Sequence, residues 1–525
     1  MNQERSDDRA DIGPAVNRRG FLGAAAAIPL VAAAAPTASA AARRRPEADL
    51  DLSDLAAPGQ LWDWEQTMVG FGQRIGGTAS HRRWLDFLED QFQRSGLVTF
   101  RDSQKLTADT PGWEATKWDL SIGSRGLEKP VPVASYYPYS GETPAAGVRA
   151  ELVDVGAGTQ AEFAARDLRG KIGYITATFP SQFDTYGVWT PSIDYLYDPD
   201  RTLTPTTPFR KACFNVFSPT LSAVPALAKQ AGCAALVIAL DATAANAAGQ
   251  YLPFAKPHAG IPILYVSRET GRQVKTQLAS GNRTARLRLR AALAPASVDN
   301  LTAVLPGTNK DEYLWLLSHS DGVNACEENG GIGFLSLARH FASRPRSRRN
   351  RSLAFHLTLH MTPYVATNGA FFEQARPDIF SKVVGLMHVE HLGQRDWIED
   401  PDAGTFQPTG QPEPAFMDVS RNPHLIDTVT KAIRAEDLRR TAVTSTTYSV
   451  GSQYDGRLPT VGFMTYPNQM LSWGVPRGRR FSQSIEKVDP QRMAAEIRTL
   501  ARVAEAMDAM PTATLAIGTE KEGAR

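Results

Sequence analysis

The strand, turn and helix that decide the fold read Leu314-Trp-Leu-Leu-Ser-His319-Ser-Asp321-Gly-Val-Asn-Ala325-Cys-Glu327-Glu328-Asn-Gly-Gly-Ile-Gly-Phe-Leu-Ser-Leu-Ala-Arg339. The apolar run at its start predicts a buried strand, and the apolar repeat at its end predicts a helix. His319 and Asp321 fall at the carboxyl end of the strand, where open α/β sheets bind their ligands. An imidazole followed by carboxylates is the donor set of a metal site, in which Asp321 can orient the His319 ring. The other interpretation is an ordinary turn whose acids cap the helix.

The whole chain has 525 residues, of which 42% are hydrophobic and 21% charged, so it can bury a large core in more than one domain. The formal net charge of +2 gives no reason to expect nucleic acid as a partner. The three cysteines contain no CxxC pair and cannot form a disulfide framework, although Cys213 and Cys233 could pair with each other.

The first forty residues read as a targeting segment. Asn17-Arg18-Arg19-Gly20-Phe21-Leu22 precedes an Ala-rich apolar run that ends at Ala38-Ser39-Ala40, which resembles a bacterial twin-arginine export signal with cleavage before Ala41. The apolar run is short and no other approaches the roughly twenty residues that span a bilayer, so no permanent membrane anchor is expected. The mature chain is therefore predicted to be extracellular or in the cell envelope.

The rest of the chain divides into five parts. Residues 41–58 are predicted to be a flexible linker, and residues 59–129 the N-terminal part of the main domain. Residues 130–296 have their own order of strands and helices, in which Leu168-Arg-Gly-Lys171, a helix and Ala235-Leu-Val-Ile238 resemble a protease-associated domain. Residues 297–510 alternate strands and helices, which predicts a doubly wound α/β domain with a mostly parallel sheet. Residues 511–525 are expected to be a disordered tail.

Ligand-type residues occur at three strand ends of the main domain. They are His319 with Asp321 and Glu327 or Glu328; His360; and His388, Glu390 and His391. Because side chains two apart along a strand share a face, His388 and Glu390 are expected to point into one site and His391 away from it. His356, in the middle of a predicted strand, is interpreted as a core histidine.

These residues give the chain a resemblance to the secreted co-catalytic zinc aminopeptidases. In that family a His-x-Asp supplies a zinc ligand, a turn Ala-x-Asp-Asn-x-Ser-Gly supplies a bridging carboxylate, and a strand ending Leu-Asp-Met-x-Gly supplies another ligand. The last two read Ala325-Cys-Glu327-Glu328-Asn-Gly-Gly331 and Val389-Glu390-His391-Leu392-Gly393 here. The resemblance implies that His319, Glu327 and Glu390 bind one zinc ion and that Asp321 orients His319. Glu328 remains an alternative to Glu327.

The other half of the family's site is missing from the sequence. Its Glu-Glu pair, which supplies the general base and a ligand of the second zinc, aligns with Met361-Thr362. Its last His ligand has no counterpart, because no histidine follows His424 and the region reads Ser449-Val-Gly-Ser-Gln-Tyr-Asp-Gly. A well-placed base is worth about a hundredfold to ten-thousandfold in rate, so catalysis with two zinc ions is not expected.

Three hypotheses remain. The preferred one is an exported hydrolase with one zinc ion, acting on a peptide or acyl-amino-acid bond, in which His360 or His388 replaces a lost ligand and Glu328 acts as the base. The second is a catalytically inactive binding protein with a peptidase fold. The third is a metal site that is only structural, with the activity located elsewhere in the chain. The sequence holds no motif for such an activity, since it contains no nucleophile elbow, P-loop or dinucleotide motif.

Overall fold

The computed structural model describes residues 50–177, 193–203, 219–251, 258–363, 370–400, 402–445, 456–465 and 485–519. The predicted export signal, residues 41–49 of the predicted linker and Cys213 lie outside these residues. The chain clusters into two units, Met1–Leu50 and Asp51–Arg525, and every helix and strand named below belongs to the second. Among the described residues, no helix has both the length and the apolar character that crossing a membrane requires.

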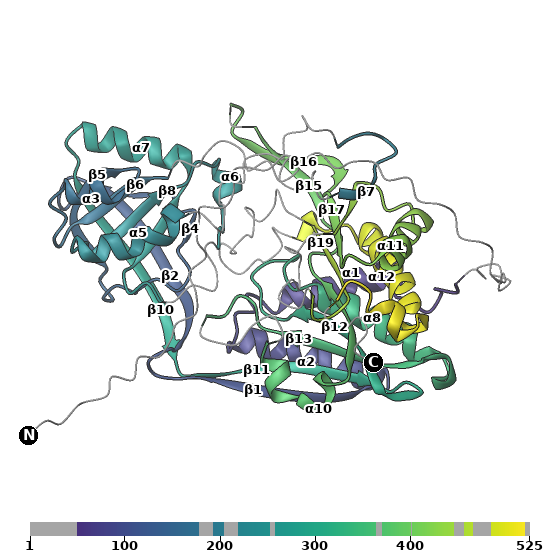
Figure 1. The fold of residues 1–525 in the computed structure, drawn as a ribbon. Coiled ribbons are helices and arrows are strands. Elements are labelled where there is room, and N and C mark those ends of the chain that lie inside the picture. Colours follow the sequence, from purple (N-terminus) through teal and green to yellow (C-terminus); the bar gives the residue numbers. More distant parts are fainter. Residues whose placement is uncertain are drawn as a thin grey trace, which may run out of the picture. The chain divides into compact units, whose positions relative to one another are not determined.

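The main sheet has nine strands in the described part of the chain (Figure 1). Their order across the sheet is β1 (Val98–Leu106), β11 (Ala296–Leu305), β13 (Arg351–Thr358), β12 (Asn309–His319), β14 (Val383–Val389), β19 (Thr460–Thr465), β17 (Ala415–Val419), β18 (Thr441–Thr444) and β7 (Ile193–Tyr197). The pairings β13/β12, β12/β14, β14/β19 and β17/β18 are parallel, and the other four are antiparallel. The sheet is therefore mixed rather than mostly parallel, with the parallel strands at its centre.

Every residue of β13 and β14 is buried, which explains why their sequences are continuous apolar runs rather than alternating ones. Adjacent residues on a strand face opposite sides of the sheet. On one side, Phe355 of β13 contacts Phe92 of α2 (Ala79–Arg94) and Phe334 of α8 (Gly330–Ser343). On the other, Trp315 of β12 contacts α9 (Ala370–Ala375) and α10 (Pro377–Phe380). Helices thus cover both faces, and the predicted α/β class is confirmed.

The main domain has three further long helices, α1 (Pro58–Gly70), α11 (Pro423–Ala435) and α12 (Pro490–Ala509). Of these, α12 contacts both α1 and α11. Two segments expected to be loose are packed. Within the predicted linker, Leu52 and Leu55 are buried and the Ala56 amide donates to Ser336 Oγ in α8 at 2.9 Å. The predicted tail begins with α13 (Thr512–Leu515), whose Leu515 is fully buried.

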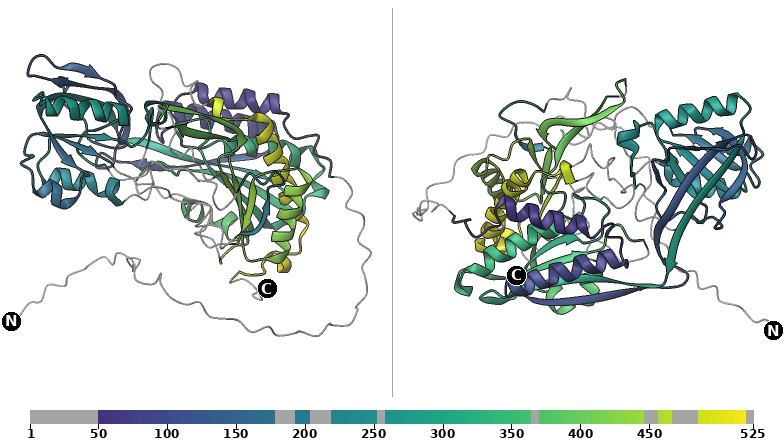
Figure 2. Two further views of the ribbon diagram at one scale, coloured as in Figure 1. Left: turned by 90° about the horizontal axis from the view of Figure 1, so that it is seen from above. Right: turned by 180° about the vertical axis from the view of Figure 1, so that it is seen from behind.

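The second sheet has eight strands among the described residues. They are, in order, β3 (Lys129–Val131), β2 (Gly112–Gly123), β10 (Thr284–Ala294), β5 (Val148–Gly156), β6 (Ile172–Thr176), β8 (Ala235–Ala239), β9 (Ile263–Val266) and β4 (Ser135–Tyr136). Its helices are α3 (Gln160–Ala164), α5 (Pro219–Gln230), α6 (Ala244–Ala247) and α7 (Arg268–Ala279). The chain passes from β1 into β2 and returns from β10 into β11, as Figure 2 lets the eye follow.

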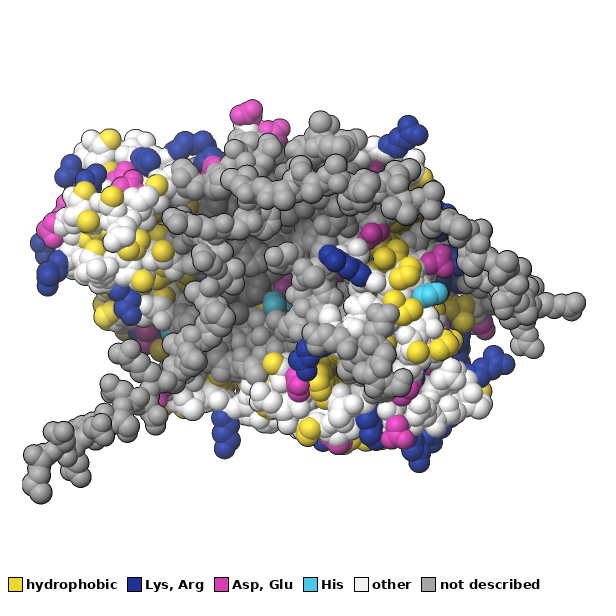
Figure 3. Space-filling model, in the orientation of Figure 1, with side chains coloured by type: hydrophobic (Ala, Val, Ile, Leu, Met, Phe, Trp, Pro, Cys, Tyr) yellow, Lys and Arg dark blue, Asp and Glu magenta, His cyan; other side chains and the backbone are white. Residues whose placement is uncertain are grey.

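Sheet membership therefore differs from the boundaries read from the sequence. β2 belongs to the second sheet although it precedes residue 130, and β7 pairs with β18 of the main sheet although it lies within residues 130–296. A separate hairpin joins β15 (Arg395–Asp400) to β16 (Thr405–Pro412). On the face shown in Figure 3, basic and acidic side chains are interspersed, as the near-balanced net charge leads one to expect.

Candidate metal centre

His319 is the last residue of β12 and is 1% exposed. Its Nδ1 lies 2.9 Å from the Asp321 carbonyl oxygen. A carbonyl oxygen only accepts, so Nδ1 carries the proton and a neutral ring presents the Nε2 lone pair on its other side. Nε2 is buried and makes no hydrogen bond within the described residues.

Asp321 fixes the loop around His319. Its carboxylate accepts from the amides of His360 and Met361 at 2.7 and 2.9 Å and from Thr362 Oγ1 at 2.7 Å. Burial alone would raise the pKa of Asp321, but the hydrogen bond and charge of His319 and the His360 amide lower it to about 2. Asp321 is therefore an anion that ties the end of β12 to the segment after β13, which contains Met361 and Thr362.

Glu327 sits in the turn before α8. The amides of Cys326 and Glu327 donate to Asn324 Oδ1 at 2.7 and 2.9 Å, which fixes the backbone that carries the carboxylate. The helix begins at Gly330, where an added Cβ would clash with Ser318 Oγ and with the Val389 carbonyl oxygen. The missing side chain lets α8 start directly beside the ends of β12 and β14, and this brings Glu327 toward Glu390.

The end of β14 carries Glu390, His388 and His391. His388 Nε2 lies 2.8 Å from Glu390 Oε1. The expectation that His391 points away is wrong, because its Nε2 lies 3.3 Å from Glu327 Oε2. The strand ends at Val389, and His391 has a φ of 57°, so the alternation of strand faces does not extend to this residue.

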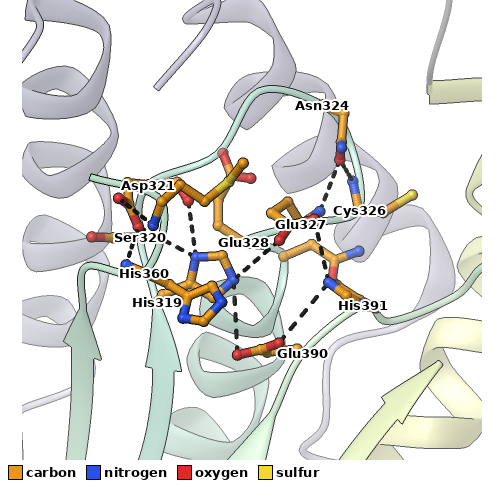
Figure 4. A network of polar contacts seen from close by, with 12 residues as sticks. His319, Ser320, Asp321, Asn324, Cys326, Glu327, Glu328, His360, Glu390 and His391 are labelled. Atoms are coloured by element: carbon orange, nitrogen blue, oxygen red, sulfur yellow. Dashed lines mark hydrogen bonds and ion pairs between the residues drawn. The ribbon is translucent and has the colours of Figure 1, made fainter. Parts of the chain in front are cut away.

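His319, Glu327, His391 and Glu390 form a closed set that we call the His–Glu ring (Figure 4). His319 Nε2 lies 3.9 Å from Glu327 Oε1 and 3.9 Å from Glu390 Oε1. On the opposite side, His391 Nε2 lies 3.3 Å from Glu327 Oε2 and 4.0 Å from Glu390 Oε2. Each carboxylate thus presents one oxygen to each imidazole.

The two buried carboxylates of the His–Glu ring favour positive charge between them. His391 Nδ1 lies 3.2 Å from the Thr465 carbonyl oxygen, so both imidazoles carry a proton on Nδ1 and face two carboxylates with Nε2. Burial alone would lower the pKa of His319, but its hydrogen bond to Asp321 and the two carboxylates of the ring raise it to about 10. The pKa of His391 is also raised, since Glu327 outweighs burial. A bound cation and protonated imidazoles are the two ways to supply this charge.

The spacing of the ring can be compared with that of a loaded metal site. Bonds of 2.0–2.1 Å separate the ligands of a tetrahedral ion by about 3.4 Å, and the ring spans 3.3 to 4.0 Å. As they stand, no three His, Cys, Asp or Glu side chains in the described part of the chain form a group that could hold a metal ion. Three of the four contacts of the ring, at 3.9 to 4.0 Å, would have to shorten by about 0.5 Å to reach the spacing of a loaded site. With its buried, unbonded His319 Nε2, the donor set suits zinc.

Glu328 does not join the ring. It forms an ion pair with Arg74, and both side chains are fully buried. Burial raises the pKa of Glu328, and Arg74 opposes this shift. The ion pairs of His319 run to Glu327 and Glu390, so Glu327 rather than Glu328 is the glutamate of this turn that faces His319.

The two other histidines proposed as ligands lie beside the ring. The His360 ring centroid is 5.3 Å from that of His319, and its backbone amide binds Asp321. His388 binds Glu390 through Nε2, and its pKa is lowered, mainly by burial. The remaining buried histidines include His356, which donates to or accepts from Thr302 Oγ1 at 2.9 Å and packs against Phe372, as expected of a core residue.

The sequence analysis missed His391 and Arg74. The run His388-Val-Glu390-His391 holds three ligand-type residues in four positions, and this density was the signal for a contribution from His391. Arg74 gave no such signal, because it follows α1 and lies 254 residues from Glu328.

Comparison with known proteins identifies the fold. The chain is similar to an aminopeptidase from Aneurinibacillus sp. strain AM-1, with 15% identity, a TM-score of 0.53, and coverage of 87% of this chain and 93% of that one. For a zinc aminopeptidase from Bacillus subtilis the values are 13%, 0.57, 85% and 94%, and for a peptidase M28 precursor from Shewanella amazonensis they are 15%, 0.56, 86% and 96%. No family model and no curated protein matches the sequence. At these identities the likeness shows the fold alone, which is the mixed α/β fold of these peptidases, and the predicted resemblance is confirmed at the level of the fold.

Proposed function

We propose that this chain is a hydrolase that uses one divalent metal ion, zinc by its ligands, on a peptide or acyl-amino-acid bond. The observation that carries the proposal is the His–Glu ring, in which two imidazole nitrogens and two carboxylates converge at the carboxyl ends of β12 and β14. Imidazole and carboxylate donors suit zinc. The fold shared with zinc aminopeptidases supports a peptide-like substrate.

We assign some residues of the site to binding the metal ion and others to proton transfer. A zinc ion at the ring would act as a Lewis acid toward the scissile carbonyl. Asp321 keeps His319 Nε2 directed at the ring, and Glu390 anchors His388. We assign His388 as the proton acceptor, because Nε2 is turned to Glu390 at 2.8 Å and Nδ1 makes no hydrogen bond within the described residues. Glu328 is not assigned this role, since its carboxylate is bound by Arg74.

A catalytically inactive binding protein is the second candidate. Two observations favour it. Met361 and Thr362 replace the family's Glu-Glu pair, and Thr362 is engaged with Asp321. Such a protein would keep the fold and the metal while recognising a peptide or acylated amino acid without cleaving it.

The location and domain content of the mature protein are part of the proposal. The twin-arginine segment in residues 1–40 supports export to the cell envelope or beyond. The Leu168-Arg-Gly-Lys171 pattern supports a protease-associated domain built on the second sheet. Both rest on resemblance of sequence.

The deciding experiment measures turnover by the purified protein with zinc added. Aminoacyl anilides, dipeptides and N-acyl amino acids serve as substrates, and Glu390→Ala is compared with Glu373→Ala, an α9 residue paired with Arg457. Hydrolysis that is lost in Glu390→Ala and kept in Glu373→Ala supports the hydrolase. A protein that binds zinc and cleaves none of these substrates is the binding protein instead.

A further inference from the structure

His391 stands in an unusual backbone conformation. Its φ of 57° lies in the left-handed region that non-glycine residues seldom adopt, and such strain persists where the surroundings fix it for a purpose. The surroundings here are β19, whose Thr465 carbonyl oxygen binds His391 Nδ1 at 3.2 Å, while the His391 carbonyl oxygen accepts from Thr465 Oγ1 at 3.3 Å. Two hydrogen bonds thus hold the turned residue to the neighbouring strand.

This conformation carries the imidazole into the His–Glu ring. His391 is 1% exposed, and its Nε2 faces Glu327 Oε2 and Glu390 Oε2, opposite the side on which His319 Nε2 faces their other oxygens. Metal-binding histidines typically donate their second ring N–H to a carbonyl or carboxylate. His391 does so as His319 does, with a carbonyl as the partner of each Nδ1.

We infer that His391 is the fourth protein ligand of a single metal ion, which would be held by two histidines and two glutamates. The residue occupies the position of Met in the aminopeptidase pattern Leu-Asp-Met-x-Gly, so that pattern does not supply it. An ion bound by all four would have no open coordination position, so a substrate could reach it only as an additional ligand or by displacing one of the four.

The inference rests on the metal binding in the proposed function but not on turnover. Its test is the affinity for Zn²⁺, measured by competition with a chromophoric chelator, in the wild-type protein, His391→Met and His388→Met. We expect one Zn²⁺ per chain in the wild type and a loss of more than about 100-fold in affinity in His391→Met, since loss of an orienting partner alone costs about 10–100-fold. His388→Met, which removes only such a partner, should lose less.

Spectroscopy separates a ligand from a neighbour. The Co²⁺-loaded wild type should show the intense visible absorption of a four-coordinate ion, and His391→Cys should add a thiolate-to-cobalt charge-transfer band. Circular dichroism of the metal-free variants confirms that each is folded. Should His391→Met not fold, His391→Cys with Co²⁺ decides the question alone.

The outcomes are distinguishable. Equal Zn²⁺ affinity in His391→Met and wild type, or a folded His391→Cys without the charge-transfer band, overturns the inference and leaves the hydrolase proposal standing. A wild-type protein that binds no metal overturns both. One tightly bound ion that needs His391, without any turnover, supports the inference and removes only the hydrolase.

Discussion

Arg74 and Glu328 form an ion pair in which neither side chain is exposed to solvent. Arg74 also donates to the carbonyl oxygens of Gly72 and Asn324, so its guanidinium ties the segment after α1 to the loop that follows β12. The backbones of the same two segments are also hydrogen-bonded. The Arg74 amide donates to the Gly322 carbonyl oxygen at 2.8 Å, and the Gly322 amide donates to the Arg74 carbonyl oxygen at 3.1 Å. The ion pair therefore stabilises the loop that carries the His–Glu ring while withholding Glu328 from it.

The first prediction concerns the stability of this loop. Arg74→Met should lower the free energy of unfolding by about 3–5 kcal/mol, because it leaves a buried carboxylate without its partner. Denaturant titration followed by circular dichroism measures the loss. Arg94→Met is the matched control, since Arg94 is 71% exposed in its pair with Asp90 and such pairs contribute at most about 1 kcal/mol. Equal losses in the two variants would contradict this account.

Much of the fold could be predicted because its central strands are buried on both faces. Leu353 to Leu359 and the residues from Val383 are nearly continuous apolar runs of the kind that predicts a buried strand, and β13 and β14 lie there. Strand direction and sheet membership could not be predicted in this way. Periodicity carries no information about the direction of a neighbour, and β7 pairs with β18 across about 240 residues of sequence.

The sequence could predict those residues of the site whose position follows from a neighbouring strand or helix. His319, Glu327 and Glu390 each follow a recognisable strand or precede a helix, and in the structure His319 Nε2 lies 3.9 Å from a carboxylate oxygen of each glutamate. His391 was misplaced because the rule of alternating faces assumes extended backbone, and its positive φ breaks that rule. The ion pair of Glu328 could not be predicted, because its partner Arg74 is distant in sequence.

The second prediction concerns Asp321. In Asp321→Ala the amides of His360 and Met361 lose their acceptor, and each unsatisfied group costs about 1–3 kcal/mol. The His319 ring also loses a nearby carboxylate, at 3.4 Å from Nδ1, so metal affinity should fall by about 10–100-fold. Thermal unfolding and chelator competition measure the two effects. Thr362→Val, which removes one of the donors to Asp321, should cost about 1 kcal/mol and leave the metal bound; a larger effect than that of Asp321→Ala would refute the assigned role.

The third prediction is a dependence of stability on pH that comes from the core. Burial lowers the pKa of His356 from 6.5 to about 3, so the folded state stays neutral where the unfolded state takes up a proton. The contribution is fully present above pH 6.5 and is lost as the pH falls from 6.5 toward 3, by at most about 1.4 kcal/mol per pH unit. His81, whose pKa burial lowers to about 4, acts in the same direction.

Substitution tests this assignment. His356→Phe keeps a ring beside Phe372 and removes the titrating group, so the fall in unfolding free energy between pH 6 and pH 4 should become shallower. Denaturant titrations at several pH values measure the slope. Exposed His424→Phe is the matched control, and a His356→Phe slope as steep as that of the control would show that the buried imidazole is not responsible.

The last prediction concerns export. In a host with a twin-arginine pathway, Arg18→Lys with Arg19→Lys should leave the protein inside the cytoplasm with its leader attached, because that pathway reads the arginine pair. Fractionation and mass measurement of the N-terminus follow the result, and the wild-type protein should begin at Ala41. Arg43→Lys with Arg44→Lys places the same substitutions beyond the cleavage site and should not affect export. Because this pathway carries folded proteins, the exported wild type should also contain metal acquired in the cytoplasm. Equal export of both double variants would exclude the twin-arginine route and leave the origin of any bound metal open to the envelope.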